Sequence, residues 1–249
     1  MLCTKGPHVG PFRFWLNIIS ICTLHRPTNM ISFKTFITEK FASGGFDYET
    51  KVADKLKKHG IMDKETKTAG SSGDAPDAHM NIKGERHSLE VKKDKHAMFG
   101  QLELHHNDEK GWHVSPRAAA KYPKTASHPA VKDFLKKVNH QWSKPSGDYD
   151  KDLKMGNVYH THKDTSPIAA HYHHDRKTPY VQIGGGHGLY HFERDKADLG
   201  THEFKGQTQL RGRMKYRGTD KKTGKKKYGA LMVMSHKGDL EKSSKNLDS

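Results

Sequence analysis

The segment PDAHMNIKGERHSLEVKK, residues 76–93, contains charged side chains whose types and spacing suit metal-dependent chemistry. Apolar and polar residues alternate through it, which predicts two short strands that each have one apolar and one polar side. Asp77 lies on the polar side of the first strand, and Glu90 and Lys92 lie on the polar side of the second. The segment therefore predicts a hairpin that brings two carboxylates and one ammonium group together.

A tight turn at Lys83-Gly84 decides which of these residues face one another. Glycine supplies the positive φ that a short hairpin loop needs. If these two residues form the whole loop, Asp77 lies opposite Glu90, whereas a three-residue loop places Asp77 opposite Val91. Cross-strand neighbours lie about 5 Å apart, so either register keeps the charged groups close.

Two carboxylates at that distance repel one another unless a cation lies between them, and carboxylate oxygens are ligands that Mg²⁺ prefers. A Mg²⁺ ion held there would activate a water molecule and stabilise negative charge on a phosphate group. Lys92 would position that water or neutralise the charge that develops during attack. The alternative is an ordinary polar hairpin face with a Glu–Lys pair and no catalytic role.

The overall charge favours a polyanionic partner. The chain has 249 residues and a formal net charge of +16, from 44 Lys and Arg against 28 Asp and Glu. Nucleic acid is the commonest partner of so basic a protein, and charge that only maintains solubility is the alternative. The length allows one large domain or two small ones. No apolar run approaches the roughly 20 residues that span a bilayer, so we expect no membrane partner.

The first 29 residues are predicted to be an upstream extension or a disordered segment, with Met30 as the natural start. The apolar stretch 12–24 is interrupted by an arginine and lacks a small-residue cleavage site, which disfavours a targeting peptide. From Met30, MISFKTFITEKF predicts an amphipathic helix and resembles the starts of proteins from large tailed phages. Both cysteines, Cys3 and Cys22, lie in the extension, so we expect neither a disulfide framework nor a Cys-based zinc site.

Several elements must position the charged hairpin. A helix is predicted over 46–59, with Glu49 near its start, and another over 129–142, where a proline occupies the first turn. Between the hairpin and that second helix, 97–106 is predicted to be extended. Beyond a polar linker at 143–152 the pattern is mainly of short strands. The segments WHV, VYHTH, AAHYHH, PYVQI, GLYHF, QLRGRMKYR and YGALMVMS are the remaining predicted strands.

The order of these features resembles the PD-(D/E)XK nuclease superfamily. Its pattern is a helix that carries Glu, then a strand that begins with Asp, then a strand that carries Glu-x-Lys. Here the helix carries Glu49, and the first strand begins with a literal Pro-Asp at Asp77. The second strand is LEVKK, with Glu90 and Lys92. The resemblance implies an α/β (α+β) fold with a restriction-endonuclease-like mixed-sheet core and flanking helices.

The resemblance also implies a role for each residue. Asp77, Glu90 and the Val91 carbonyl would bind Mg²⁺, for which Mn²⁺ could substitute. Lys92 would assist the attacking water, and Glu49 would tune the site or bind a second ion.

Three more residues belong to this interpretation. Gln101 matches a glutamine that family members often carry in the following element. Lys93 and Gln101 are predicted to contact DNA. The family usually has a helix at that point, whereas the segment around Gln101 has an extended pattern. Asp74, in the GSSGD loop, is a rival for the role of Asp77.

A second group of cations lies in KGQTQLRGRMKYRGTDKKTGKKK, residues 205–227, which contains ten Lys or Arg and one acidic residue. Arg211, Arg213, Lys215 and Arg217 alternate, so a strand would place them on one face, where they could follow a phosphate backbone. The stretch TDKKTGKKK would be a hairpin tip that reaches into a groove. The alternative is a solvated edge strand whose charges prevent aggregation.

Two other metal sites compete with this interpretation. The chain has 20 histidines, and HTH, HYHHD and HGLYH could supply imidazoles to zinc. The stretch HHND at 105–108 invites comparison with HNH nucleases, but later ligands at suitable spacing are not evident.

GGGHG at 184–188 lacks a following helix, so it predicts a hairpin turn and not a phosphate-binding loop.

The sequence thus predicts a nuclease core at 30–145, a β-rich basic DNA-binding region at 146–236 and a flexible tail at 237–249. The predicted activity is that of a Mg²⁺-dependent DNA endonuclease in the cytoplasm of a bacterial host, if phage-encoded. Site-specific cleavage, as in restriction or homing enzymes, and resolution of branched DNA are both compatible with it. A homodimer is one possible arrangement. A non-catalytic nucleic-acid-binding or phage structural protein is the alternative.

Overall fold

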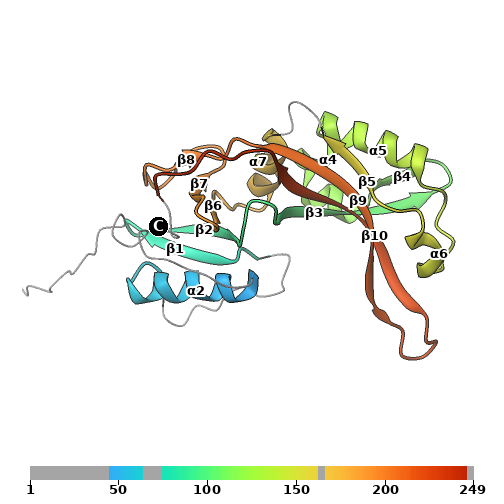
Figure 1. Cartoon of the computed structure of the whole chain (residues 1–249), viewed down its shortest axis with the longest axis horizontal. Coiled ribbons are helices and arrows are strands. Elements are labelled where there is room, and N and C mark those ends of the chain that lie inside the picture. Colours follow the sequence, from blue (N-terminus) through green and yellow to red (C-terminus); the bar gives the residue numbers. More distant parts are fainter. Residues whose placement is uncertain (1–44, 64–74, 162–165, 246–249) are drawn as a thin grey trace, which may run out of the picture. The chain divides into compact units, whose positions relative to one another are not determined.

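The computed structural model describes residues 45–63, 75–161 and 166–245, which form two five-stranded sheets and the helices that pack on them (Figure 1). All of the described residues belong to one compact unit. The predicted α+β class is confirmed. The helix expected after Met30 and the rival carboxylate Asp74 lie outside the described residues.

The first sheet, sheet A, contains the charged hairpin. Its strands lie in the order β1-β2-β6-β7-β8. β2 runs antiparallel to β1 but parallel to β6, and β7 runs parallel to β8, so the sheet is mixed. The strands are β1 Ala78–Ile82, β2 Glu85–Lys92, β6 Tyr180–Ile183, β7 Gly188–His191 and β8 His202–Glu203.

The second sheet, sheet B, is antiparallel throughout, with its strands in the order β4-β3-β10-β9-β5. Glycines mark two close approaches to its buried face: a Cβ on Gly212 would lie 3.1 Å from the Trp142 ring, and one on Gly100 would lie 2.6 Å from the Tyr172 ring. The strands are β3 Met98–Asn107, β4 Gly111–Val114, β5 Val158–Thr161, β9 Gln207–Thr219 and β10 Lys226–Lys237.

The helices cover the apolar faces of these sheets. Two of them, α2 and α5, agree with the predicted helices to within about a residue at each end, as expected from their apolar faces. α5 packs against β4, β5 and β9 of sheet B, and α2 packs against β1 and β2 of sheet A. The helices are α2 Gly45–Lys58, α3 Pro116–Lys121, α4 Pro123–Ala126, α5 Pro129–Gln141, α6 Tyr149–Leu153 and α7 Ser166–Asp175.

One predicted strand is wrong. The segment AAHYHH lies within α7 and is helical. Ile168, Ala169 and Tyr172 are all buried, and their spacing of one and four residues is that of a helix face. The histidines of the same segment, His171 and His173, imitated a two-residue alternation. The other predicted strands are confirmed.

The boundary predicted at residue 145 does not separate the two sheets. β1 and β2 precede it and pair with β6–β8, while β3 and β4 precede it and pair with β5, β9 and β10. Within the described part of the predicted tail, Leu240 is buried, and Leu189 N donates to Lys245 O at 2.6 Å. Each sheet therefore needs strands from both sides of residue 145.

Candidate active site

The β1–β2 hairpin has the shorter of the two predicted loops. Ile82 pairs with Glu85, so Lys83 and Gly84 form the whole turn, and both have positive φ, 52° and 81°. This is the backbone that a two-residue type I′ hairpin requires. Ala78 pairs with Leu89, so Asp77, one residue earlier, lies opposite Glu90 as the two-residue loop predicts.

The two sides of the hairpin are buried against different helices. Ala78, Met80, Leu89 and Val91 belong to a core cluster with α2. The opposite side carries Glu90, which pairs with Val181 of β6, and this side faces the cluster that includes α7. Glu90 and Asp77 are buried in consequence, which makes their charges costly unless they are paired.

Lys92 pairs with both carboxylates. Its Nζ lies 2.6 Å from Glu90 Oε1 and 3.5 Å from Asp77 Oδ2. The Val91 N–H donates to the same Asp77 oxygen at 2.8 Å. The structure therefore brings together three of the four predicted catalytic side chains and places the ammonium group between the two acids.

A second cation, absent from the sequence-based site, reaches the cluster from the end of α7. Arg176 Nη1 lies 2.8 Å from Glu90 Oε2, and Nη2 donates to the Ala75 carbonyl at 2.6 Å. Its guanidinium also lies 5.7 Å from the centre of the Tyr172 ring. A helix at 166–175 followed closely by the buried strand β6 could have indicated Arg176 from the sequence. Arg176 was missed because that helix was predicted to be a strand.

Glu49 completes the predicted catalytic set from α2. Burial raises its pKa to about 7, and the negative charge of Asp77 contributes to the rise. Its Oε2 is buried and has no hydrogen-bond partner among the described residues. Glu49 is therefore a carboxyl group that can gain or lose a proton near neutral pH beside two other acids.

The ionisation of the cluster follows from the balance of burial and pairing. Burial, the largest influence on Asp77, raises its pKa, and Lys92 opposes that effect. Burial would lower the pKa of Lys92, but the charges of Glu90 and Asp77 outweigh it, so this pKa is raised. Lys92 is thus held as a cation, which suits it to charge neutralisation and not to proton abstraction.

The donor chemistry fits a hard divalent cation, although the observed arrangement is one of ion pairs. Asp77, Glu90 and the unpartnered Glu49 oxygen supply the oxygen donors that Mg²⁺ prefers. The described residues contain no group of three or more His, Cys, Asp or Glu arranged around a common point. Lys92 and Arg176 occupy the positions next to Glu90, so a metal would have to replace at least the Lys92 contact.

Gln101 does not belong to this cluster. It lines a cavity of about 280 Å³ at the edge of β3, where Arg117 and Lys121 of α3 and Arg217 of β9 also meet. Tyr172 lines the same cavity, and the centre of its ring lies 5.7 Å from the Arg176 guanidinium, which contacts Glu90. Lys93 is exposed at the end of β2.

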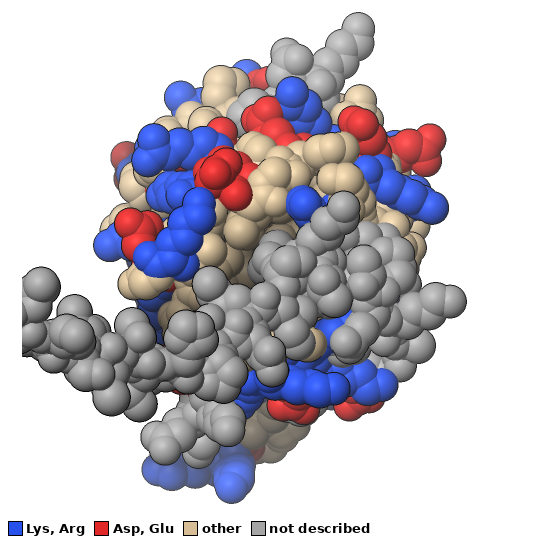
Figure 2. Space-filling model, turned by 90° about the vertical axis from the view of Figure 1, so that its left-hand side faces the viewer, with Lys and Arg blue, Asp and Glu red and all other residues tan. Residues whose placement is uncertain are grey.

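The four alternating cations of β9 have different surroundings. Lys215 is exposed, whereas Arg211 and Arg213 are half-buried. Arg217 lies across Gly229, where an added Cβ would come within 2.9 Å of Nε, and its Nη2 reaches Glu103 Oε1 at 2.6 Å. Of these four, only Lys215 is both exposed and without an ion pair to the described residues. On the face that Figure 2 shows, Lys and Arg lie among Asp and Glu and form no continuous patch of the described residues.

The histidine segments show no zinc cluster within the described ranges. His173 is buried and stacks on Phe192 with ring centres 4.1 Å apart, and His174 pairs with Glu193 at 2.9 Å. Among the described helices, none is long and apolar enough to cross a membrane.

No protein-family model, curated protein or solved structure matches the chain. The resemblance to PD-(D/E)XK nucleases therefore has only the residues and their arrangement as support.

Proposed function

We propose that the chain is a metal-dependent deoxyribonuclease that hydrolyses phosphodiester bonds in DNA. The observation that supports this function most is the arrangement of Asp77, Glu90 and Lys92 on one buried hairpin, with Lys92 Nζ 2.6 Å from Glu90 and 3.5 Å from Asp77. Replacing a buried ion pair by apolar side chains of similar volume is often neutral or stabilising, so stability alone does not require charged residues here.

Asp77 and Glu90 would hold Mg²⁺ or Mn²⁺, and the Val91 carbonyl would join them as the family resemblance implies. When bound, the ion would supply Lewis-acid stabilisation of phosphate charge and lower the pKa of a water molecule. Arg176 would keep Glu90 in place through the oxygen that it already contacts. Lys92 would leave the space between the acids and direct its ammonium group toward the phosphate.

Hydrolysis needs one bond made, one bond broken and two proton transfers, one from the attacking water and one to the leaving oxygen. The water oxygen attacks phosphorus while the bond from phosphorus to the leaving oxygen breaks, without a covalent enzyme intermediate. Glu49 Oε2, unpartnered among the described residues and with a pKa of about 7, accepts the proton that the water loses. The leaving oxygen takes a proton from solvent, and Lys92 stabilises the charge on the phosphate oxygens during the step.

A non-catalytic DNA-binding protein is the second candidate, and one observation favours it. Lys92 and Arg176 together supply two positive charges to Asp77 and Glu90, so the cluster is neutral without a metal. In that case the cluster would stabilise the fold, and exposed Lys and Arg side chains of this chain, whose net charge is +16, would bind DNA.

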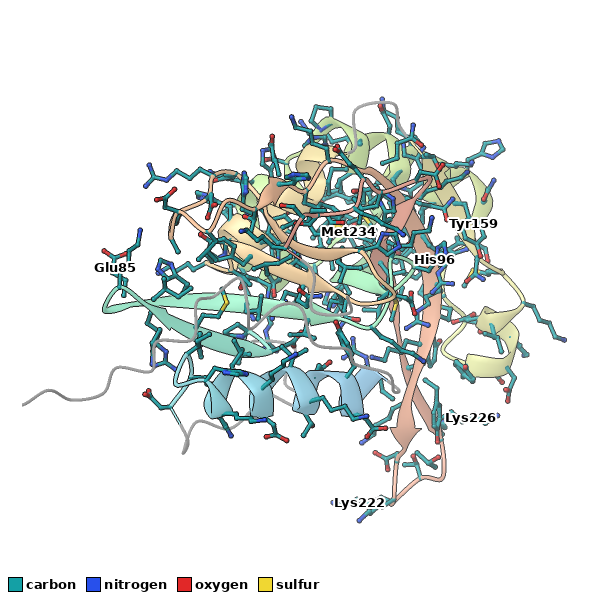
Figure 3. All side chains as sticks on the ribbon, turned by 60° about the vertical axis from the view of Figure 1, so that its left-hand side comes forward. Glu85, His96, Tyr159, Lys222, Lys226 and Met234 are labelled. Carbon is teal, nitrogen blue, oxygen red and sulfur yellow. The ribbon has the colours of Figure 1, made fainter. Side chains whose placement is uncertain are left out.

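The deciding experiment is cleavage of supercoiled, linear, branched and single-stranded DNA by the purified chain, with Mg²⁺, Mn²⁺ or EDTA. Asp77→Asn and Lys92→Met should each abolish metal-dependent cleavage while DNA binding in EDTA survives. Glu85→Gln is a matched control, because Glu85 lies on β2 at the opposite, exposed end of the hairpin (Figure 3).

Circular dichroism and thermal melts establish that each variant is folded. Cleavage by the wild type and by Glu85→Gln, but by neither site variant, supports the nuclease. Absence of metal-dependent cleavage on every substrate, with DNA binding intact, overturns the nuclease and supports the binding protein. The pattern of products separates site-specific cutting from action on branched DNA.

A further inference from the structure

A two-stranded ribbon extends from sheet B, and we call its residues 215–229 the arm. Residues 98–104 of β3 pair with residues 230–235 of β10, and β5 pairs with residues 209–212 of β9. Neither neighbouring strand pairs with residues of the arm. Within the described residues, the arm strands therefore pair with each other alone. Figures 1 and 3 both show the ribbon continuing past its neighbours, and Figure 3 labels Lys222 at its end.

The tip of the arm is held by its one acidic residue. Asp220 Oδ1 accepts the backbone N–H groups of Lys222 and Thr223 at 2.9 and 3.0 Å. Lys227 Nζ lies 2.9 Å from the same carboxylate, and its hydrogen bond is the main reason that the pKa of Asp220 falls to about 2. The turn thus has a defined shape before any partner binds.

The base of the arm is braced by α6. Tyr149 lies against Tyr216 and Tyr228, with ring centres 5.7 and 5.6 Å apart. Lys226 Nζ lies 2.7 Å from Asp150. Tyr228 also donates from its hydroxyl to Asp152. These contacts fix the direction in which the ribbon leaves the sheet.

The cations of the tip divide into two kinds. Lys226 and Lys227 are used in the contacts just described, with Asp150 and Asp220. Three others are exposed and form no ion pair with the described residues, and they are Lys221, Lys222 and Lys225. The ammonium groups of these three lysines form no ion pair with the described residues, so their charge is available to a partner.

We propose that the arm inserts into the major groove of double-stranded DNA and that Lys221, Lys222 and Lys225 bind its phosphates and base edges there. This inference rests on the proposed function for its choice of DNA and specifies a duplex as the substrate. The major groove of B-form DNA is about 12 Å wide and admits a two-stranded β-ribbon, whose strands lie about 4.8 Å apart. The major groove of an RNA duplex is too deep and narrow for side chains to read.

Single-stranded DNA fits the arm less well. Proteins that bind single strands stack successive bases on exposed aromatic rings. Tyr216 is the arm's one substantially exposed aromatic residue, at 46%, and its hydroxyl is hydrogen-bonded to Thr219. Tyr228 packs against Tyr149. A charged tip with a single accessible ring favours groove and phosphate contacts.

The test compares the full-length chain with a tip variant, Lys221→Gln/Lys222→Gln/Lys225→Gln, in EDTA so that no cleavage occurs. The matched control, Lys110→Gln/Lys154→Gln/Lys242→Gln, removes three exposed lysines from outside the arm. Affinity for duplex DNA is measured across a salt series. Dimethyl sulfate then probes guanine N7 in the major groove and adenine N3 in the minor groove.

We expect the tip variant to bind duplex DNA at least tenfold more weakly and to lose about 2–3 units of salt slope, since each phosphate contact contributes about 0.9. Guanine N7 protection seen with the wild type should disappear in the tip variant but persist in the control. Three results would overturn the proposal. They are an equal loss of duplex affinity in the tip variant and the control, protection from dimethyl sulfate confined to adenine N3, and tighter binding to single-stranded than to duplex DNA. Because binding is measured without metal, a failure of the nuclease leaves this result unaffected.

Discussion

Arg176 Nη1 lies 2.8 Å from Glu90 Oε2, although 86 residues separate them, and only 7% and 4% of the two side chains is exposed. Arg176→Ala should therefore leave a buried carboxylate short of one partner, which costs about 3–5 kcal/mol of unfolding free energy. Urea unfolding measures this loss. If the variant folds, metal-dependent cleavage should also fall, because Glu90 is no longer held.

Arg176→Lys is the matched variant, since it keeps the charge but cannot contact Glu90 and the Ala75 carbonyl together as the guanidinium does. We expect an intermediate loss of stability. A stability of Arg176→Ala equal to that of the wild type would show that Glu90 is not buried beside this cation.

A second prediction concerns the end of β6 next to Lys92. Gly184 N donates to Lys92 O at 2.8 Å, and a Cβ on Gly184 would lie 2.3 Å from Lys93 O and 2.9 Å from the Tyr48 ring. Gly184→Ala should thus force β2 and β6 apart, with a loss of about 1–3 kcal/mol or more and reduced cleavage. Thermal melts and plasmid assays check both effects.

Gly185→Asn is the control for this site. Gly185 has φ +68°, and an added Cβ there would have no neighbour within 4 Å. Asparagine tolerates that backbone better than most residues, so the variant should retain stability and cleavage. An equal loss of stability in both variants would mean that Gly184→Ala acts through the turn conformation and not through the contact with Lys93 O.

The hairpin could be predicted from the sequence because its information is local. Alternation, a Lys-Gly turn and the spacing of Asp77, Glu90 and Lys92 all lie within 18 residues, and the turn fixes the register. Arg176 could not be found this way, since its place beside Glu90 depends on the packing of α7 on sheet A. The alternating histidines of α7 concealed the helix that immediately precedes Arg176.

The linker at 143–152 shows a similar limit. Its polar composition predicted a domain boundary, but Asp148 accepts from the N–H groups of Asp150 and Lys151 and caps α6. An acidic N-cap signal was present in the sequence. What the sequence could not supply was the tertiary partner, since α6 is held by Tyr216 and Tyr228 from strands some 70 residues away.

The third prediction concerns the β9 cations and their contact with DNA. Lys215 is exposed without an ion pair to the described residues, whereas Arg217 is committed to Glu103 at 2.6 Å. Lys215→Gln should lower the salt slope of DNA binding by about 1 and leave unfolding unchanged. Arg217→Gln should change the slope less for the same loss of charge, because Glu103 already neutralises it. The reverse order of the two slopes would contradict this assignment.

The last prediction concerns pH and His173. This imidazole is fully buried against the Phe192 ring. Burial, reinforced by the positive charges of Arg176 and Lys92, holds its pKa well below 6.5. Below about pH 6.5 the unfolded chain therefore binds a proton that the folded chain does not, so stability should fall with decreasing pH by up to about 1.4 kcal/mol per pH unit.

Glu49 acts in the opposite direction over part of the same range. Its pKa is raised from 4.5 to about 7, so between these values the folded chain holds the extra proton and acid favours folding. The contribution of His173 is isolated by comparing the wild type with His173→Phe, which preserves the stack on Phe192. Urea unfolding from pH 5 to pH 8 should show the wild type losing more stability toward acid than the variant. His140→Gln, at an exposed position on α5, should follow the wild-type curve, and parallel curves for wild type and His173→Phe would refute the assignment.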